Sequence, residues 1–208
     1  MYMLRTFCVL FTVMMAVGQT ASATEDGRSA AFALIQGLGN EAIGQLRNPA
    51  VSPSQREARF RRLLNDHFDM AAISRFILGR YYRSANEAQR VEFQRLFVDF
   101  VVRSYAARLG ENRGERFSVT GSSVENDGMV LVHSTIAIPS SEEIHVDWRL
   151  RGAESNLAIV DIIVEGVSMA VTQRSAFAAM IQDHGGVGGA IEALRATDLQ
   201  SADSGAGQ

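Results

Sequence analysis

The stretch Ile144–Ser168, IHVDWRLRGAESNLAIVDIIVEGVS, decides the fold of this chain. Residues 144–150 alternate between apolar and polar side chains, which is the period of a half-buried β-strand. Residues 157–164 are apolar and mostly β-branched except for Asp161, as in a strand that is covered on both faces. Gly and Asn residues between the two segments mark a turn. The stretch therefore predicts an antiparallel hairpin.

Two more strands precede this hairpin. From Arg116 the apolar period becomes two, Asn126-Asp127-Gly128 is typical of a hairpin turn, and Pro139 ends the following strand. The apolar residues share one face if Ile136 lies opposite Val146 or two positions away, and Trp148 opposite Val160 or Ile162. The same register places Arg149 beside Asp161 as a cross-strand ion pair. This predicted sheet face contains Phe117, Val119, Val130, Val132, Ile136, Ile138, Ile144, Val146, Trp148, Leu150, Val160, Ile162 and Val164.

Helical periodicity flanks the strands on both sides. Before the sheet we expect helices over residues 29–46, 53–68 and 70–78, and a fourth that the segment 84–87 opens and that runs to about residue 109. Two more follow the sheet, one from a Ser168 cap and one over 187–196. Asp69 and Gly79 are the expected caps of the third helix, and Ser84 that of the fourth. This order indicates an α+β domain with a four-stranded antiparallel sheet.

The N-terminus has the features of a cleaved signal peptide. Arg5 precedes an apolar segment over residues 6–17, and Ala21-Ser22-Ala23 has the small residues of a cleavage site. An uncleaved anchor is the alternative, but the apolar segment is short for a membrane span. We therefore expect a signal peptide at 1–23, one domain at 24–198 and a disordered tail at 199–208. The sole cysteine, Cys8, lies in the signal, so the exported domain needs no disulfide.

Most kinds of catalytic chemistry find no support in the sequence. The four histidines lack metal-ligand spacing, and there is no P-loop or dinucleotide fingerprint. A net charge of −3 gives no support for nucleic-acid binding. A hydrolase using Asp161 or Glu165 is the remaining enzymatic hypothesis, although no activating partner is visible. We expect a monomeric protein that is not an enzyme and uses no metal or cofactor.

Excess apolar surface is the feature that these exclusions leave. The helix over 87–109 carries apolar residues around more than half its circumference. This helix and the sheet face either pack directly on each other or enclose a cavity for an apolar ligand. Such a cavity would let a carrier protein shield a lipid from water in an aqueous compartment. Exposing two acyl chains to water costs on the order of 20 kcal/mol, at ~0.8 kcal/mol per CH₂.

Several segments together resemble the MlaC-type periplasmic phospholipid-binding family, also called the toluene-tolerance family. They are Phe68-Asp69, Leu78-Gly79-Arg80-Tyr81-Tyr82-Arg83, the segments 84–87 and 93–97, Val160 to Ser168, and Arg174 to Phe177. The resemblance covers about residues 30 to 196. The sequence departs from the family pattern at Tyr82, Leu157 and Gln173, where other aromatic residues are expected.

The resemblance implies a twisted four-stranded sheet wrapped by helices, with acyl tails inside and the head group near the surface. It implies a soluble auxiliary component of an ABC transporter, which carries phospholipid between an inner-membrane complex bearing an MCE-domain protein and an outer-membrane lipoprotein complex. That activity helps to maintain outer-membrane lipid asymmetry. A hopanoid or sterol-like ligand is one alternative, and a structural adaptor that binds no lipid is another.

We expect the lipid-contacting and head-group residues to come from distant segments. Arg80, Arg83 and Arg174 are the candidates for the phosphate or for partner docking. The candidates for the tail-contacting wall are Phe76, Tyr81, Phe93, Phe97, Phe100, Val146, Trp148, Ile162, Val164 and Val167.

Overall fold

The computed structural model of the 208-residue chain describes residues 19–46, 48, 50–109, 114–139 and 141–205, so most of the predicted signal peptide lies outside the described residues. The division into signal, domain and tail stays a prediction. The elements in chain order are α1 (Gln19–Leu46), α2 (Pro53–His67), α3 (Met70–Leu78), the 3₁₀ turn η1 (Gly79–Tyr82), α4 (Glu87–Leu109), β1 (Arg116–Val124), β2 (Val130–Ala137), β3 (Ile144–Arg151), η2 (Glu154–Asn156), β4 (Ala158–Val164), β5 (Val167–Ser168), α5 (Met169–Asp183) and α6 (Val187–Gly205).

The strands form one antiparallel sheet in the order β1-β2-β3-β4-β5, which confirms the α+β class. The prediction of four strands missed β5, a two-residue strand. It forms because Glu165 and Gly166 adopt positive φ angles of 48° and 77°, which turn the chain back so that Val167 pairs with Val164.

The register of the central strands agrees with the sequence pattern. Trp148 pairs with Ile162, and Ile136 pairs with Ile144, two positions from Val146. Val160 is wrongly placed by the prediction. A bulge shifts the register so that Leu150 pairs with Ile159, and Ile159, not Val160, is the fully buried residue.

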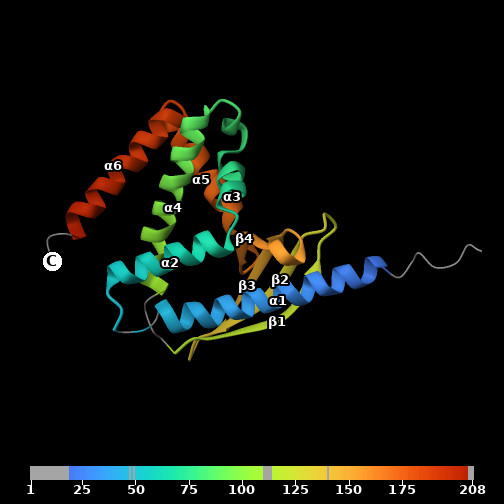
Figure 1. The fold of residues 1–208 in the computed structure, drawn as a ribbon. Helices are drawn as coiled ribbons and strands as arrows, with labels where there is room; N and C mark the ends of the chain where they lie inside the picture. The colour runs from blue at the N-terminus through green and yellow to red at the C-terminus, as the bar shows by residue number, and fades with distance from the viewer. Residues whose placement is uncertain (1–18, 47, 49, 110–113, 140, 206–208) are drawn as a thin grey trace, which may run out of the picture.

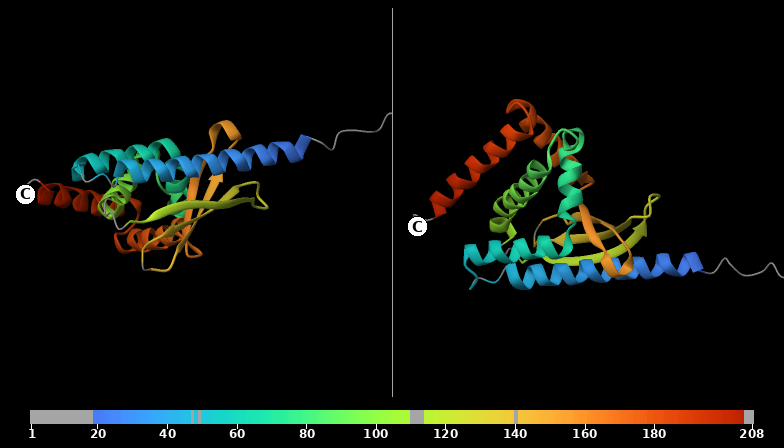
Figure 2. Two further views of the ribbon diagram at one scale, coloured as in Figure 1. Left: turned by 90° about the horizontal axis from the view of Figure 1, so that it is seen from below. Right: turned by 45° about the horizontal axis from the view of Figure 1, so that its top comes forward.

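Helix α1 covers the apolar face of the sheet, and Figure 2 shows it alongside the strands in both views. Ile35 and Leu38 pack there against Val132 and Leu150. Gly39 permits the close approach, because a Cβ at this position would overlap the ring of Phe117. The sequence predicts that the α4 stripe faces this surface, and that prediction is wrong. The apolar pattern that begins at residue 29 does not reveal that the helix starts at Gln19.

The stripe of α4 belongs to a second core, formed with α2, α3, α5 and α6 (Figure 1). Phe93, Phe97 and Phe100 each lie within 5.4–5.5 Å of the Phe177 ring of α5, in edge-to-face geometry. We call this the helical core, and the cluster under α1 the sheet core. Phe60 and Phe68 pack against both cores and join them.

An ion-pair network also ties α4 to α6. Glu92 accepts hydrogen bonds from Arg95 and from Arg195 of α6, and these two guanidinium groups lower the pKa of Glu92 to about 2. The carboxylate is thus the link between the two helices at this point.

Most of the predicted helix caps are correct. Asp69 accepts a hydrogen bond from the Ala72 amide at 2.8 Å, and Ser168 accepts one from Val171. The fourth cap is Asn86 instead of Ser84: its side chain accepts from the Gln89 amide, while the Gln89 side chain accepts from the Asn86 amide. No helix in the described part of the chain is both long and apolar enough to cross a membrane.

Candidate functional site: an arginine-lined hollow

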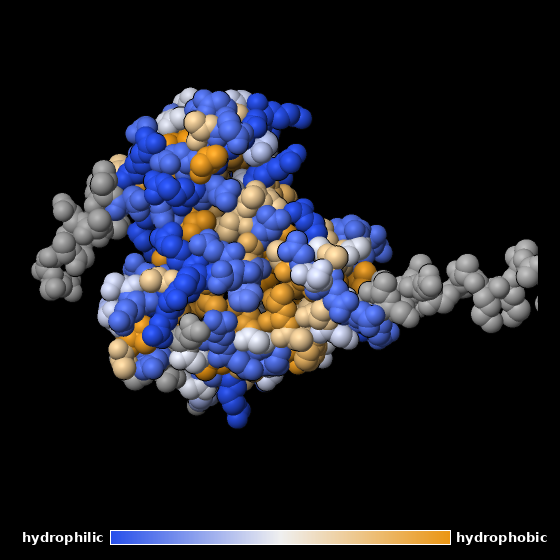
Figure 3. All heavy atoms as spheres, in the orientation of Figure 1, coloured by the Kyte–Doolittle hydropathy of each residue, from blue (hydrophilic) through white to orange (hydrophobic). Residues whose placement is uncertain are grey.

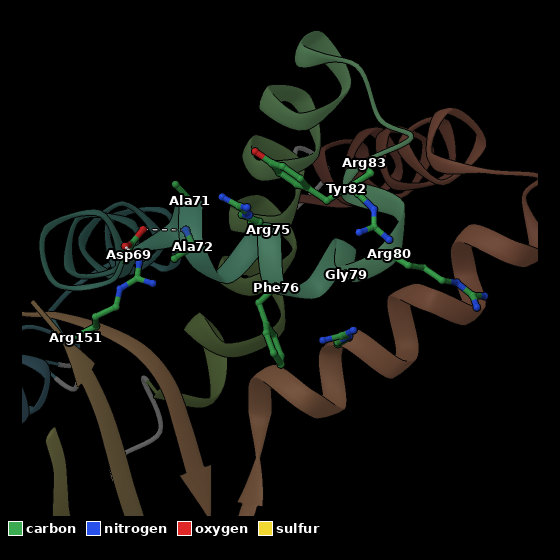
Figure 4. A pocket seen from close by; sticks show the side chains of 11 residues that line it. Asp69, Ala71, Ala72, Arg75, Phe76, Gly79, Arg80, Tyr82, Arg83 and Arg151 are labelled. Atoms are coloured by element: carbon green, nitrogen blue, oxygen red, sulfur yellow. Dashed lines mark hydrogen bonds and ion pairs between the residues drawn. The ribbon is translucent and has the colours of Figure 1, made fainter. Parts of the chain in front are cut away.

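A hollow of about 870 Å³ opens beside α3 and η1. Figure 3 shows the molecule notched between the upper helices and α1, with hydrophobic side chains in the notch and hydrophilic ones around it. Figure 4 shows the hollow at close range, with Arg75, Arg80 and Arg83 on the α3–η1 segment and Arg151 reaching in from β3. The lining comprises Asp69, Ala71, Ala72, Arg75, Phe76, Gly79, Arg80, Tyr82, Arg83, Arg151 and Arg174.

The local backbone explains how these side chains converge. Asp69 starts α3 and Gly79 ends it, with a φ angle of 53° that favours glycine. This turn directs the chain into η1, so that Arg80 and Arg83 follow α3 closely. Gly79 also leaves room for Arg174 of α5, since a Cβ at Gly79 would lie 3.0 Å from the Arg174 Nε.

Four of the five arginines have no acidic partner in the described ranges. Arg151 donates to Asp69 at 2.7 Å, so the only carboxylate of the lining is already engaged. The salt bridges of the described residues include none of the other four, which are Arg75, Arg80, Arg83 and Arg174. The hollow therefore carries a concentrated positive charge.

Aromatic rings hold three of these guanidinium groups in place. Arg75 lies 5.0 Å from the Tyr82 ring centroid, and Arg174 lies 4.9 Å from that of Phe76. Arg80 stacks on Tyr81 and donates to its hydroxyl at 2.7 Å. The hydrogen bond from Arg80, and to a smaller extent one from Gln182, lowers the pKa of Tyr81. These contacts orient the cations without neutralising them.

Apolar side chains are exposed on the elements that form the hollow. Phe76 lines it and is 41% exposed. Val171, 53% exposed, lies one turn before Arg174 on α5. Val167, also 53% exposed, lies in β5, which directly precedes α5 but does not line the hollow. The same elements thus offer cationic groups and unpacked apolar groups, which suits a ligand that is both anionic and apolar.

The structure brings some of the predicted residues together and separates others. Phe76 and the three predicted arginines all line the hollow, and Tyr81 adjoins it through Arg80. Phe93, Phe97 and Phe100 lie in the helical core, whereas Trp148 and Ile162 pack against the sheet core. Val146 and Val164 are paired with each other in the sheet, and Val167 is exposed.

Arg75 and Arg151 line the hollow but were not anticipated from the sequence. A signal for Arg75 exists, because residues 70–86 contain three arginines and no Asp or Glu. Arg151 has no such signal, since its position beside Asp69 depends on the parallel bridge between Phe68 and Ile159.

The carboxylates of the hydrolase hypothesis are both engaged in structural contacts. Asp161 is 7% exposed and accepts hydrogen bonds from Arg149, Ser168 and the Ala170 amide. Glu165 accepts from the His145 amide, which lowers the pKa of Glu165. Among the described residues no group of His, Cys, Asp and Glu could hold a metal ion.

Comparison with known proteins places this geometry in context. The family model described as MlaC protein matches residues 36–196. A solved structure of a phospholipid-binding protein from Ralstonia solanacearum, in complex with a phospholipid, aligns with a TM-score of 0.73 at 21% identity. The alignment covers 83% of this chain and 98% of the Ralstonia chain, so the two proteins share a fold.

Proposed function

The chain belongs to the MlaC family, and from this premise we propose that it is a periplasmic phospholipid carrier. In this proposal the protein is exported with a cleaved signal peptide. It then moves phospholipid between the inner-membrane ABC transporter with its MCE-domain protein and the outer-membrane lipoprotein complex. The activity would maintain outer-membrane lipid asymmetry, and the protein would act by binding and not by catalysis.

The observation that carries the proposal is the combination of charges in the hollow. Among the described residues, Arg75, Arg80, Arg83 and Arg174 have no carboxylate partner, and the exposed ring of Phe76 lines the same hollow. Guanidinium groups bind phosphate strongly and in defined geometry. A phospholipid supplies both a phosphate for the arginines and acyl chains for the apolar surface.

The acyl chains need a path from the hollow into the interior, and the boundary between the two cores offers one. Asp69 lines the hollow, and the preceding residue, Phe68, packs against both cores. In the proposal, tails that enter here separate the two cores and contact Phe97 and Phe100 on one side and Trp148 and Ile162 on the other. Tail burial returns ~0.8 kcal/mol per CH₂, which offsets the contacts that separate.

Native mass spectrometry tests the proposal directly. The protein is purified from the periplasm without detergent, weighed intact and then extracted with solvent. Phospholipid bound in about one-to-one stoichiometry supports the carrier function. A bound hopanoid would retain the mechanism with another lipid. Protein that is bare, and that gains no mass after incubation with liposomes, would refute lipid carriage and favour the adaptor.

A further inference from the structure

We infer that the arginine-lined hollow selects anionic phospholipids, such as phosphatidylglycerol, over zwitterionic ones such as phosphatidylcholine. This inference rests on the proposed function and names the lipid class that the site would take. It follows from how the charges of the hollow are distributed, not from the mere presence of arginine.

The first step is the local imbalance of charge. The chain as a whole has a net charge of −3, yet the hollow has five arginines against one carboxylate. Elsewhere several described arginines pair with acidic residues: Arg95, Arg149 and Arg195 each bind two carboxylates. Self-repulsion among unpaired guanidinium groups is relieved by an anion, so the hollow is arranged to accept negative charge.

The second step concerns the cationic part of a zwitterionic head group. Its ammonium lies one short ethylene linker from the phosphate, so a phosphate held by the unpaired arginines of the hollow keeps the ammonium within the same arginine-lined space. The carboxylate that would receive it, Asp69, already binds Arg151 at 2.7 Å and caps α3 through Ala72. The ammonium of a zwitterionic head group is thus repelled by the arginines and finds no free carboxylate in the lining. A glycerol head group carries only hydroxyls, which donate and accept hydrogen bonds without this repulsion.

The third step is the position of the cations relative to the apolar groups. Arg174 lies over the Phe76 ring, so the site that attracts phosphate begins where the exposed apolar surface begins. An anion with no apolar part would bind the arginines and leave the exposed apolar surface beside them uncovered. The shared chemistry is a phosphate monoester or diester, and its source, lipid or free phosphate, is separated by the experiment below.

The test is a competition between two lipids in one vesicle. Delipidated protein is incubated with vesicles of equimolar phosphatidylglycerol and phosphatidylcholine that have identical acyl chains. The protein is recovered after the vesicles are sedimented, and its lipids are quantified by mass spectrometry. We expect the anionic lipid to exceed the zwitterionic one by on the order of tenfold, equivalent to about 1.4 kcal/mol. Because both lipids share one membrane, the encounter with the surface is the same for each.

Matched variants locate the source of the preference. The double variant Arg83→Gln/Arg174→Gln should reduce the ratio to within about threefold, and the loss should fall mainly on the anionic lipid, because the removed charges favour that lipid over the zwitterionic one. The single variant Arg83→Gln should give an intermediate ratio. Within the described residues the Arg83 side chain is exposed and makes no hydrogen bond or ion pair, so this substitution should leave the fold intact. Arg62→Gln is the control: Arg62 is exposed on α2 and does not line the hollow.

Three outcomes contradict the inference in different ways. Equal uptake of both lipids by the wild type would overturn the selectivity and leave lipid carriage standing. Uptake of neither lipid would overturn the proposed function and this inference with it. Equal uptake of both lipids, together with thermal stabilisation of wild type but not of the double variant by millimolar inorganic phosphate, would assign the hollow to free phosphate instead of a head group.

Discussion

Replacing Asp161 with Asn tests whether this buried carboxylate is structural. Its three donors are Arg149 at 3.2 Å, the Ser168 hydroxyl at 2.6 Å and the Ala170 amide at 2.9 Å. Asn has one acceptor oxygen where Asp has two, so one donor loses its partner and faces an NH₂ group. A hydrogen bond to a charged group contributes about 1.5–3 kcal/mol. Arg149 keeps two bonds to Glu125, so the full 3–5 kcal/mol of a broken buried pair is not reached.

We therefore expect Asp161→Asn to lower the free energy of unfolding by about 2 kcal/mol, which is a fall in Tm of about 4–8 °C for a domain of this size. Urea unfolding followed by the fluorescence of Trp148, the single tryptophan, measures it. Asp147→Asn is the control: its carboxylate is 32% exposed and bonds to His133, so its loss should stay within about 1 kcal/mol. A loss below 1 kcal/mol for Asp161→Asn, or equal losses in both variants, would refute the reasoning. Bound lipid should be unchanged in Asp161→Asn.

Three further predictions concern other parts of the molecule. Gly39→Ala should destabilise the protein by about 1–3 kcal/mol, because the new methyl group would overlap the Phe117 ring. Gly37→Ala has open space around the new methyl group and should stabilise the protein by about 0.5–1 kcal/mol through helix propensity. Urea unfolding of both variants separates the effect of the close approach of α1 from that of helix propensity. Tyr81→Ala removes the ring on which Arg80 stacks beside the hollow, so it should release bound lipid faster with a small change in Tm. Unchanged lipid content with a large loss of Tm would contradict a role of Tyr81 in retaining lipid. Because two arginines lower the pKa of Glu92 to about 2, its stabilisation is present above pH 4.5 and is lost as the pH falls towards 2. The Tm of Glu92→Gln should therefore lie below that of the wild type at pH 7 and close to it at pH 2, as measured by circular dichroism.

The strands and their register could be predicted because each depends on neighbours in sequence. Alternation fixed the faces of β3, and a one-residue slip would have turned Trp148 to solvent. The pattern failed at the bulge between β3 and β4. Ile159 and Val160 lie there next to each other and are both apolar and β-branched, so neither alternation nor strand propensity indicates which of them faces the core. The cap at Asn86 was missed for a similar reason, since Ser84 offers an equally good motif two residues earlier.

The layer order could not be predicted from the same patterns. An apolar helix stripe specifies that it must be covered, but not by which surface. Helices α1 and α4 both carry apolar residues that must be covered, and it is α1 that lies on the sheet face, where the lack of a side chain at Gly39 lets the helix approach the ring of Phe117 closely. The rings of α4 are then covered by Phe177 of α5, a contact between residues far apart in sequence.

The same ambiguity governs the lipid wall. A phenylalanine that packs on other rings and one that packs on an acyl chain exchange water for apolar surface with the same free energy per unit area, so burial cannot distinguish the two roles. Charge can, because an unpaired guanidinium is not stabilised by a packed core. Arg80, Arg83 and Arg174, which the sequence offered as candidates for the phosphate or for partner docking, lie around one hollow, while Phe93 and Trp148 were assigned to one wall and lie in two cores. If a ligand does unite that wall, it must separate the cores where Phe68 joins them. Lipid loading should then replace contacts of Phe68 with the two cores by contacts with acyl chains, and leave the bond between Arg151 and Asp69 in place.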